Sequence, residues 1–349
     1  MRVVHLIAPG KMGGAENVIL DGVEALREEN VDARILLLQT EHEPRHQMAE
    51  EAHRRKIPFG ILRGNLQRSI NRSSIVPFVV DSIVHSHGRV AAWYALRTRA
   101  YSKGWIAHLH GFLERDERER IYNRIERTLV RQSDEVICVS TALCRFGGNA
   151  AHWHHIPNGR SFHPASATSS IAKTRFLFLG RLSKEKGVDV LIRALVGTGH
   201  CVDLVGDGDE HNELRELVDS LKLHPQVRFL GHQNDVSPYL SRCSALVLPS
   251  RTEGMPLCIL EAQFAGVPVI ATDVGDVRKA LLGDAHILVP PDNVNAFKTA
   301  MDVFSVEKQE RKRKAKKLAK RAQAFFSMNR WASQVAGLYD VIEQKNRTA

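Results

Sequence analysis

The chain has 349 residues, of which 43% are hydrophobic and 25% are charged. This composition is that of a globular protein and excludes a disordered one, and the length suits two domains better than a single core. The formal net charge of +10 predicts an anionic partner: a nucleic acid, an anionic membrane surface or a phosphorylated ligand.

The first predicted element is a β-strand in the opening stretch "MRVVHLIAPG", because its apolar run is too short for a secretory signal. No run of about 18 uninterrupted apolar residues follows, so no transmembrane span is expected. The five cysteines are scattered and none forms a C-x-x-C pair, which argues against a disulfide framework and a zinc site. Together these features predict a protein of the reducing cytoplasm.

Apolar runs rich in Val, Ile and Leu recur along the chain, with room for a helix between them. In the first half the predicted strands are residues 2–8, 33–40, 82–88, 105–111 and 134–140, with an amphipathic helix over Asn17–Glu29. In the second half they are residues 175–181, 201–206, 227–231, 244–250, 267–272 and 286–289, with a helix over Lys184–Ala194. This alternation predicts an α/β fold of two doubly wound, Rossmann-like domains.

The joint between the domains is predicted at "IPNGRSFHPASATSSIAK", residues 156–173, where Pro, Gly, Ser and Thr cluster and the periodicity lapses. We therefore expect an N-terminal domain over residues 1–164 and a C-terminal domain over residues 165–325. The tail, residues 326–349, is apolar at helical spacing. It predicts a last helix that either returns to the first domain or packs on the second.

Two basic stretches carry much of the charge. The block "KQERKRKAKKLAKR", residues 308–321, is interpreted first as the solvated face of a helix, with contact to a membrane left open. A looser group flanks the apolar segments "IPFGIL" and "SIVPFVV". That pattern suits a surface resting on anionic lipid, although buried strands with charged loops would look similar. The group consists of Arg54, Arg55, Lys56, Arg63, Arg68 and Arg72.

Loops that follow the predicted strands are the candidate sites, because open α/β sheets bind ligands beyond the carboxyl ends of their strands. The first loop has Gly10, Gly13 and Gly14, which do not fit G-x-G-x-x-G, and no G-x-x-x-x-G-K-[ST] motif occurs. Neither a dinucleotide cofactor nor a P-loop is expected. Gly13 and Gly14 would let backbone N–H groups approach an anion at the following helix, or form only a tight turn.

The second candidate loop is "FLGRLSKEKGVDVLIRAL", residues 178–195, where Arg181 and Lys186 precede a helix. Cations oppose the helix dipole at this end, so their presence favours a bound anion. Opposite unit charges about 4 Å apart near a surface attract by about 4 kcal/mol, which is enough to matter for a diphosphate. The alternative is a pair of exposed cations with no ligand.

The third candidate is "SRTEGMPLCILEAQFAGVPVIATDVG", residues 250–275, in which Glu253 and Glu261 lie eight positions apart. On one continuous helix they would differ by about 80° and share no face. Because Gly254 and Pro256 interrupt the stretch, the two acids can converge on one crevice. Carboxylate oxygens accept hydrogen bonds only, which suits sugar hydroxyls, and the amides at the start of the helix are free for a ligand.

These motifs, in this order, resemble the retaining glycosyltransferases of family 4, which have the GT-B fold of two facing Rossmann-like domains. The signature E-x7-E appears as "EGMPLCILE", followed by "AQFAGVPVIAT", and "GRLSKEKG" is similar to the phosphate element of the family. The shorter motifs "GGAEN", "VHSHG", "HLHG", "IPNG" and "LVGDGDE" also stand in the expected order. The resemblance covers most of the chain.

The resemblance implies transfer of a hexose-type sugar from a uridine or guanosine diphosphate sugar to a lipid-linked saccharide, a lipopolysaccharide or a polysaccharide. By the same resemblance, the catalytic residues would be His110, Glu253, Arg181 and Lys186. Arg181 and Lys186 would neutralise the diphosphate, Glu261 would bind the ribose, and Glu253 and His110 would bind the sugar. The remaining donor contacts would be Gly13, Gly14, Gly231, His232, Gly254, Met255, Pro256 and Leu257.

The resemblance further implies retention of the anomeric configuration without a cofactor. No carboxylate stands out as a covalent nucleophile, so same-face attack assisted by the leaving phosphate is the mechanism expected. The Arg-rich surface suggests an acceptor at an anionic membrane and a cytoplasmic enzyme lying peripherally on the inner face.

Two groups of residues could suggest a metal-binding site. His85, His87, His108 and His110 form two H-x-H pairs on consecutive predicted strands, each pair facing one way. No third cluster was found to finish a site, so no metal is expected there. Asp207 and Asp209 resemble the metal-binding D-x-D of a different glycosyltransferase fold. Because they follow a strand, they are interpreted as a turn and helix N-cap.

Two other functions compete with glycosyl transfer. A nucleic-acid-binding protein would need aromatic side chains on its basic face, whereas residues 308–321 contain none, so no nucleic acid is expected as a partner. A sugar-nucleotide epimerase or another enzyme on the same fold is the second, since a fold does not determine an activity. Release of a free epimeric sugar without transfer would distinguish it.

Overall fold

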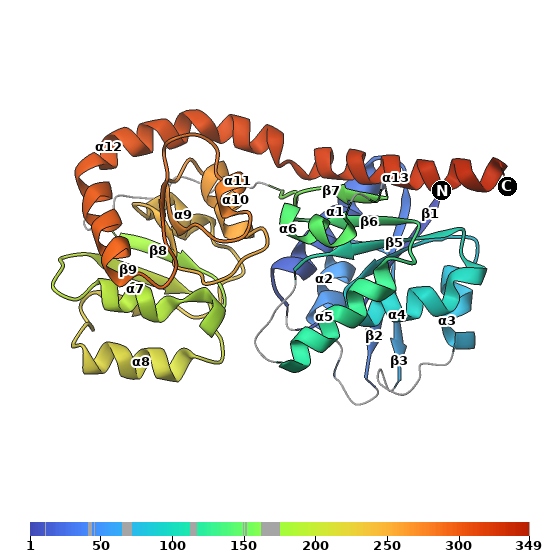
Figure 1. Cartoon of the computed structure of the whole chain (residues 1–349), viewed down its shortest axis with the longest axis horizontal. Coiled ribbons are helices and arrows are strands. Elements are labelled where there is room, and N and C mark those ends of the chain that lie inside the picture. Colours follow the sequence, from blue (N-terminus) through green and yellow to red (C-terminus); the bar gives the residue numbers. More distant parts are fainter. Residues whose placement is uncertain are drawn as a thin grey trace. The chain divides into compact units, whose positions relative to one another are not determined.

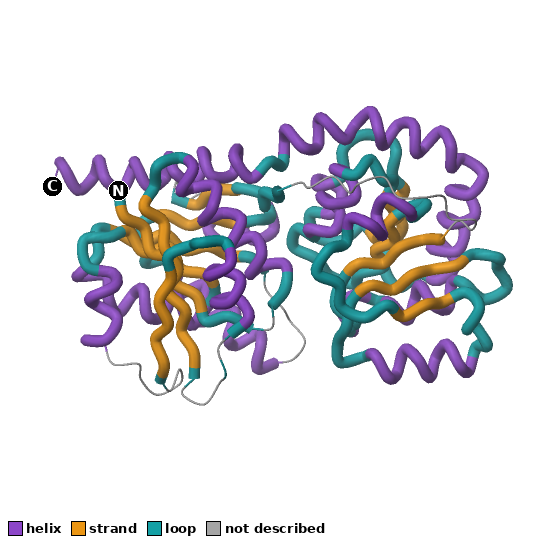
Figure 2. Tube along the Cα trace, turned by 180° about the vertical axis from the view of Figure 1, so that it is seen from behind, coloured by secondary structure: helices purple, strands orange, loops and turns teal. Residues whose placement is uncertain are grey.

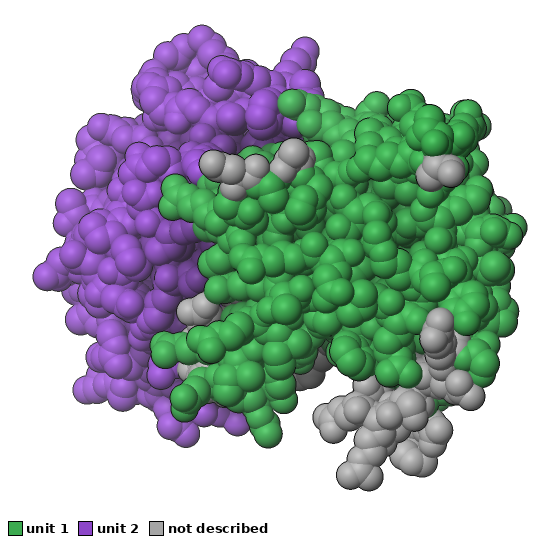
Figure 3. All heavy atoms as spheres, turned by 45° about the vertical axis from the view of Figure 1, so that its right-hand side comes forward, with its two compact units in different colours: residues 1–161, 327–349 green, residues 162–326 purple. Residues whose placement is uncertain are grey.

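The computed structural model describes residues 1–10, 12–40, 44, 46–64, 72–111, 117–148, 150, 152–161 and 175–348. The chain divides into two compact units (Figure 3). Unit 1 comprises Met1–Ser161 together with Ser327–Ala349, and unit 2 comprises Phe162–Phe326. The boundary expected between residues 164 and 165, and Arg68 of the basic group, lie outside the described residues.

Unit 1 is built on a seven-stranded parallel sheet in the order β3-β2-β1-β4-β5-β6-β7 (Figure 1). The order runs outward in both directions from β1 and β4, which makes the sheet doubly wound. Its strands are β1 (Arg2–Ile7), β2 (Asp32–Gln39), β3 (Phe59–Arg63), β4 (Ile83–His87), β5 (Gly104–Leu109), β6 (Glu135–Cys138) and β7 (Trp153–His155). Its helices are α1 (Gly14–Glu28), α2 (Gln47–Arg54), α3 (Arg72–Val79), α4 (Arg89–Thr98), α5 (Glu117–Val130), α6 (Thr141–Cys144) and α13 (Met328–Thr348).

Unit 2 repeats this architecture with a six-stranded parallel sheet in the order β10-β9-β8-β11-β12-β13, whose strands lie side by side in Figure 2. Its strands are β8 (Arg175–Leu179), β9 (Cys201–Val205), β10 (Val227–Phe229), β11 (Leu246–Leu248), β12 (Val269–Thr272) and β13 (Ile287–Val289). Its helices are α7 (Val188–Ala194), α8 (His211–Ser220), α9 (Ser237–Arg242), α10 (Leu257–Phe264), α11 (Val277–Ala280) and α12 (Val294–Phe325). The predicted fold class, two doubly wound Rossmann-like domains, is confirmed.

All eleven predicted strands exist, but the prediction missed β3 and β7. Both are edge strands of the unit 1 sheet. Phe59 to Leu62 in β3 are only half-buried, and β7 is three residues long with two histidines. An edge strand lacks the continuous Val/Ile/Leu run that marks a strand buried on both faces.

The C-terminal helix α13 belongs to the core of unit 1. Trp331 is 2% exposed, and a Cβ atom added to Gly22 of α1 would lie 2.6 Å from its indole ring. Ile342 is equally buried, and a Cβ on Gly104 of β5 would lie 2.5 Å from it. Two glycines therefore let α13 approach the first helix and the sheet closely.

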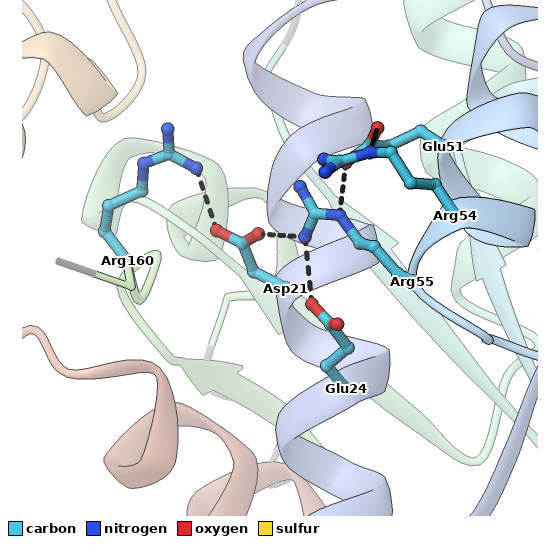
Figure 4. Close-up of polar contacts among 6 residues, drawn as sticks. All are labelled: Asp21, Glu24, Glu51, Arg54, Arg55 and Arg160. Atoms are coloured by element: carbon cyan, nitrogen blue, oxygen red, sulfur yellow. Dashed lines mark hydrogen bonds and ion pairs between the residues drawn. The ribbon is translucent and has the colours of Figure 1, made fainter. Parts of the chain in front are cut away.

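A buried carboxylate, Asp21 of α1, joins distant parts of unit 1 (Figure 4). It is 5% exposed and accepts hydrogen bonds from Arg55 at 2.7 Å and from Arg160 at 2.8 Å. Arg54 donates to Glu51, and Arg55 also donates to Glu51. Two members of the basic group assigned to a lipid surface therefore pair with carboxylates of the protein itself.

The basic block, residues 308–321, lies in the second half of α12. Lys312 donates to the carbonyl of Cys243 at 3.0 Å, and Lys314 pairs with Asp284 at 2.5 Å. Arg313 pairs with Glu310 within the helix at 2.7 Å. Two of these three cations pair with carboxylates of unit 2, while Lys316, Lys317, Lys320 and Arg321 are exposed, in agreement with the solvated helix face expected here. Among the helices of the described residues, none is both long and apolar enough to cross a membrane.

Candidate donor-binding site

The predicted site residues of unit 2 lie at its topological switch point, between β8 and β11. Arg181 and Lys186 follow β8, and Glu253 follows β11. The strand order reverses here, so the two loops diverge to opposite faces of the sheet and leave room for a ligand at the carboxyl edge.

Lys186 and Glu253 form an ion pair, with Nζ and Oε1 2.6 Å apart. The side chains are 23% and 7% exposed, and the Ser250 hydroxyl donates to the same carboxylate oxygen at 2.6 Å. Burial acts to lower the pKa of Lys186, but the Glu253 carboxylate outweighs it and the pKa is raised. Lys186 therefore stays charged at neutral pH. Burial, reinforced by Glu253, raises the pKa of neighbouring Cys258 to about 12, so that thiol is not a nucleophile.

Glycine backbones hold Glu253 in place. Gly275, after β12, has a φ of +55°, and a Cβ there would lie 1.9 Å from the Glu253 carbonyl oxygen. Gly187 has a φ of +63°, and its Cβ would lie 2.3 Å from the carbonyl oxygen of Pro249. No side chain fits at either position, so the loops that carry Lys186 and Glu253 are in direct backbone contact with their neighbours.

Arg251 ties the two loops together from a position that the sequence analysis missed. Its backbone N–H donates to the carbonyl of Glu185 at 2.8 Å, and its guanidinium binds both carboxylate oxygens of Asp189 at 2.9 Å. A bidentate pair of this kind fixes geometry as well as charge. Nothing local in the sequence distinguishes Arg251 from a solvated loop residue.

Arg181 is exposed directly after β8, and its side chain has no hydrogen bond or ion pair with another described residue. The loop behind it is rigid: Leu182 donates its N–H to Asp207 at 3.0 Å, and a Cβ on Gly206 would lie 1.8 Å from the Gly180 carbonyl oxygen. The guanidinium therefore projects from a fixed backbone.

The other predicted donor contacts of unit 2 lie on neighbouring segments. Pro256 is the N-cap of α10 and supplies no side-chain hydrogen bond to it, and half-buried Glu261 lies in the second turn of that helix. Met255 is buried, while Gly254 and Leu257 are half-buried. After β10, Gly231 accepts a hydrogen bond from Gly206 at 2.8 Å and His232 is exposed.

The predicted residues of unit 1 lie at the carboxyl edge of its own sheet. Gly13 is the extended N-cap of α1, after β1, and Gly14 is its first residue. His110 directly follows β5 and is half-buried, and burial lowers its pKa to about 4. His85 and His108 are buried in the unit, as expected.

Two sequence interpretations need correction. A third strand does contribute to the histidine cluster, because His5 of β1 joins His85 and His87 with ring nitrogens within 4.8 Å of one another. The sequence shows His5 only as a single histidine in a strand, and its place in the cluster becomes apparent once the strand register is known. The "DGD" segment leads into a turn at Asp209 and Glu210 but is not an N-cap, because Glu210 is the N-cap of α8 and its side chain makes no capping hydrogen bond.

Comparison with known proteins gives two matches that together span most of the chain. The model "Glycosyltransferase Family 4" matches residues 12–161, and "Glycosyl transferases group 1" matches residues 173–304. The chain belongs to the family 4 glycosyltransferases. This family 4 glycosyltransferase has the GT-B fold, so the family and the fold that the E-x7-E resemblance implied are confirmed.

Similar proteins agree with this assignment. An uncharacterized glycosyltransferase of Haemophilus influenzae is 25% identical over 84% of this chain and 87% of its own length. Glycogen synthase of Mycobacterium tuberculosis is 27% identical over 68% of this chain and 59% of its own. The crystal structure of HepE from Anabaena in complex with UDP-glucose superimposes with a TM-score of 0.85 and 21% identity, covering 98% of this chain and 100% of HepE.

Proposed function

We propose that this family 4 glycosyltransferase transfers a hexose-type sugar from a nucleoside diphosphate sugar, with retention of configuration, to a lipid-linked saccharide, lipopolysaccharide or polysaccharide. The Lys186–Glu253 pair at the switch point of unit 2 carries the proposal. In this proposal the cation of the pair would meet the diphosphate and the carboxylate beside it would meet the sugar. The UDP-glucose complex of HepE and the similarity to glycogen synthase support a nucleotide sugar and a glycan acceptor.

Each member of the pair keeps capacity for a ligand. An ammonium has three N–H donors, and one reaches Glu253, which leaves two for phosphate oxygens. On Glu253, Oε1 accepts from Lys186 and Ser250, and Oε2 has no partner among the described residues. A sugar hydroxyl can donate to Oε2 while the ammonium faces the diphosphate.

The charges then explain catalysis. Cleavage of the sugar–phosphate bond puts negative charge on the diphosphate and positive charge on the anomeric carbon. Lys186 and the guanidinium of Arg181, which has no partner among the described residues, would stabilise the first by electrostatics already in place before the reaction. The leaving phosphate would assist attack from the same face, and the cations of the chain would take the place of a metal. A covalently glycosylated enzyme, trapped with donor alone, would refute this.

The resemblance assigns the remaining contacts. Glu261 would bind the ribose hydroxyls, and Gly231 with His232 would contact the base. The amides from Gly254 through Met255 and Pro256 to Leu257 would surround the phosphates and sugar. In unit 1, Gly13 and Gly14 would offer amides to the donor, and His110 would meet a sugar hydroxyl.

Replacing Arg181 with alanine is expected to weaken UDP or GDP binding by about tenfold to a hundredfold, because hydrogen bonds to charged groups contribute about 1.5–3 kcal/mol. Calorimetric titration with both diphosphates measures the loss and identifies the base. Arg193→Ala, which removes another exposed arginine of unit 2, is the matched control. Equal affinity of both variants would contradict the proposed site, and release of free epimeric sugar without transfer would favour an epimerase.

We infer that unit 1 contacts an anionic membrane through α3, α4 and α5, of which α4 packs against both others (Figure 1). Phe78, Trp93, Ile121 and Ile125 are 41%, 46%, 54% and 44% exposed on these helices. Exposed basic residues accompany them: Arg97, Arg118, Arg120 and Arg124. Apolar side chains that enter the headgroup region and arginines that meet anionic lipid form the usual peripheral membrane surface. The location would be the inner face of the cytoplasmic membrane.

Vesicle flotation tests this surface. The protein is expected to bind phosphatidylcholine vesicles only when they also contain phosphatidylglycerol, and to dissociate in high salt. The double variant Ile121→Glu/Ile125→Glu should reduce binding at least about tenfold, since burying one such side chain is worth about 1.5–3 kcal/mol. Val306→Glu is the control, because Val306 is 89% exposed on α12 of unit 2. A loss of binding in that control equal to the loss in the double variant would refute the assignment.

A further inference from the structure

Five histidine rings gather against one face of the unit 1 sheet. Side chains in a strand alternate between faces, so His85 and His87 of β4 share a face. In the sheet register His5 of β1 pairs with His85, and His87 pairs with His108 of β5. His110 continues from β5 past its end. Among the described residues, one other polar ring forms hydrogen bonds with these histidines, that of Tyr339 of α13.

Among the described residues these six rings form one unbranched hydrogen-bonded chain, which we call the histidine chain. Its contacts, in order, are His110 Nε2 to His87 Nδ1 at 2.9 Å, His87 Nε2 to His5 Nδ1 at 3.0 Å, His5 Nε2 to Tyr339 Oη at 3.5 Å, Tyr339 Oη to His85 Nδ1 at 2.6 Å, and His85 Nε2 to His108 Nδ1 at 3.2 Å. At the far end, His108 Nε2 is buried without a partner among the described residues. At the near end, His110 directly follows β5 at the carboxyl edge of the sheet, and its Nδ1 is the ring nitrogen outside these contacts.

Ring geometry favours hydrogen bonds over a shared metal ion. His87 and His110 have centroids 5.2 Å apart, about the nitrogen–nitrogen distance plus two ring radii, as expected for rings bonded edge to edge. By contrast, His108 and His110 stack at 4.2 Å with planes 13° apart. The nitrogen lone pairs of stacked rings lie in parallel planes about a ring thickness apart, which is a poor arrangement for binding one ion in both planes. His85 and His87, stacked at 4.6 Å and 18°, have the same arrangement.

All five imidazoles are neutral at pH 7. Burial lowers the pKa of His5 to about 3 and of His110 to about 4, and it lowers the pKa of His85, His87 and His108 well below the usual value. A neutral imidazole has one N–H donor and one bare acceptor nitrogen. Each hydrogen bond therefore determines the direction of the next, and the whole chain has a single polarity.

Tyr339 sets that polarity. Its 2.6 Å contact with His85 Nδ1 lies within the range of hydroxyl donors and below that of N–H donors, so the phenol donates to His85. The phenol oxygen then accepts from His5 Nε2, His5 Nδ1 accepts from His87, and His87 Nδ1 accepts from His110 Nε2. This order leaves the proton of His110 on Nε2 and a bare Nδ1.

We propose that Tyr339, His5 and His87 are positioning residues that lock His110 as its Nε2–H tautomer, so that its Nδ1 is a hydrogen-bond acceptor for one sugar hydroxyl. The sugar part of the proposal rests on the proposed function. An acceptor nitrogen that cannot take a proton at neutral pH selects a hydroxyl in the donor sugar and does not attract the diphosphate. Tyr339, in the last helix, thereby determines whether His110 at the end of β5 donates or accepts the hydrogen bond to the sugar.

The tautomer can be measured without a substrate. In protein labelled with ¹⁵N-histidine at pH 7, we expect the His110 Nδ1 resonance at the position of an unprotonated nitrogen, assigned by its loss in His110→Gln. Tyr339→Phe removes one oxygen from the chain and should yield a mixture of tautomers at His110. Tyr94→Phe is the matched control, because it removes the hydroxyl of another buried tyrosine of unit 1 outside the chain. His5→Phe interrupts the chain at a second point and should act like Tyr339→Phe.

Kinetics provide the second readout. Tyr339→Phe should lower kcat/KM for the nucleotide sugar roughly fivefold, the worth of one neutral hydrogen bond, and leave UDP or GDP binding unchanged. A protonated Nδ1 in the unaltered protein, or identical spectra and kinetics for Tyr339→Phe and Tyr94→Phe, would overturn the proposal. So would a stoichiometric zinc or nickel ion that His87→Gln removes. If no sugar is transferred but the tautomer shifts as expected, the histidine chain stands and the proposed function fails.

Discussion

Lys186→Met is expected to lower kcat for sugar transfer by about 10²–10³, the usual cost of removing one preorganised group that stabilises charge in a transition state. The substitution also leaves Glu253, 7% exposed, with Ser250 as its remaining described partner. Breaking a buried pair costs up to about 3–5 kcal/mol, and we expect the lower end because Lys186 is 23% exposed. Activity and thermal unfolding therefore both report on the pair.

A double variant separates the two effects. In Lys186→Met/Glu253→Gln the unpaired charge is gone, so stability should return toward that of the original protein while transfer stays low. Lys184→Met, an exposed lysine of the same turn, is the control and should change neither property. Recovery of transfer in the double variant would mean that the pair is only structural.

Acidification from pH 7 to pH 5 is expected to unfold unit 1. The four buried histidines and half-buried His110 have pKa values below the usual 6.5 in the folded protein, so the unfolded chain binds more protons as the pH falls. Their contribution to stability is complete above pH 6.5 and is lost progressively below it, down to about pH 4 for His110 and about pH 3 for His5. Each loses about 2 kcal/mol by pH 5, about 10 kcal/mol together.

One group opposes this loss. Burial raises the pKa of Glu126 in α5 to about 7, so its uptake of a proton in the folded state returns about 2 kcal/mol over the same interval. The net loss of about 8 kcal/mol is comparable with the whole stability of a typical domain, which is about 5–15 kcal/mol. Unit 1 should therefore lose its fold while most carboxylates are still ionised.

Tryptophan fluorescence isolates the response of unit 1, because all four tryptophans, Trp93, Trp105, Trp153 and Trp331, belong to it. Denaturant titrations at pH 7, 6 and 5 should show the fluorescence midpoint falling steeply, and far-ultraviolet circular dichroism should retain the signal of unit 2. Equal fluorescence midpoints at pH 7 and pH 5 would show that the histidines are hydrated in the native state.

The strands at the centre of both sheets could be predicted because burial on two faces demands unbroken runs of Val, Ile and Leu. The edge strand β3 gave no such signal, since Gly60 and its half-buried neighbours need no continuous apolar run. Arg181 and Lys186 were predicted because cations oppose the dipole at a helix N-terminus, and Glu253 because Gly254 and Pro256 separate it from Glu261. Their roles remain predictions.

What the sequence did not reveal depends on contacts between distant positions. Lys186 and Glu253 are 67 residues apart, and their pairing arises only when β8 and β11 become neighbours in the sheet. Gly275 contacts the backbone of Glu253, and a contact between positions 22 residues apart produces no recognisable local sequence pattern. His5 looks like a single histidine in a strand until the register places it beside His85.

Because α13 completes the core of unit 1, unit 1 is not a continuous segment of the chain, and its last element is synthesised after the whole of unit 2. On the ribosome, residues 162–326 are made after the seven strands of unit 1 and before the helix that carries Trp331 and Tyr339. At about 5–20 residues per second this interval lasts on the order of ten to thirty seconds. During this interval the part of unit 1 already synthesised exposes the apolar surface around Gly22 and Gly104. We therefore expect unit 2 to complete its fold before unit 1, and chaperones to bind the exposed surface of unit 1 in the meantime.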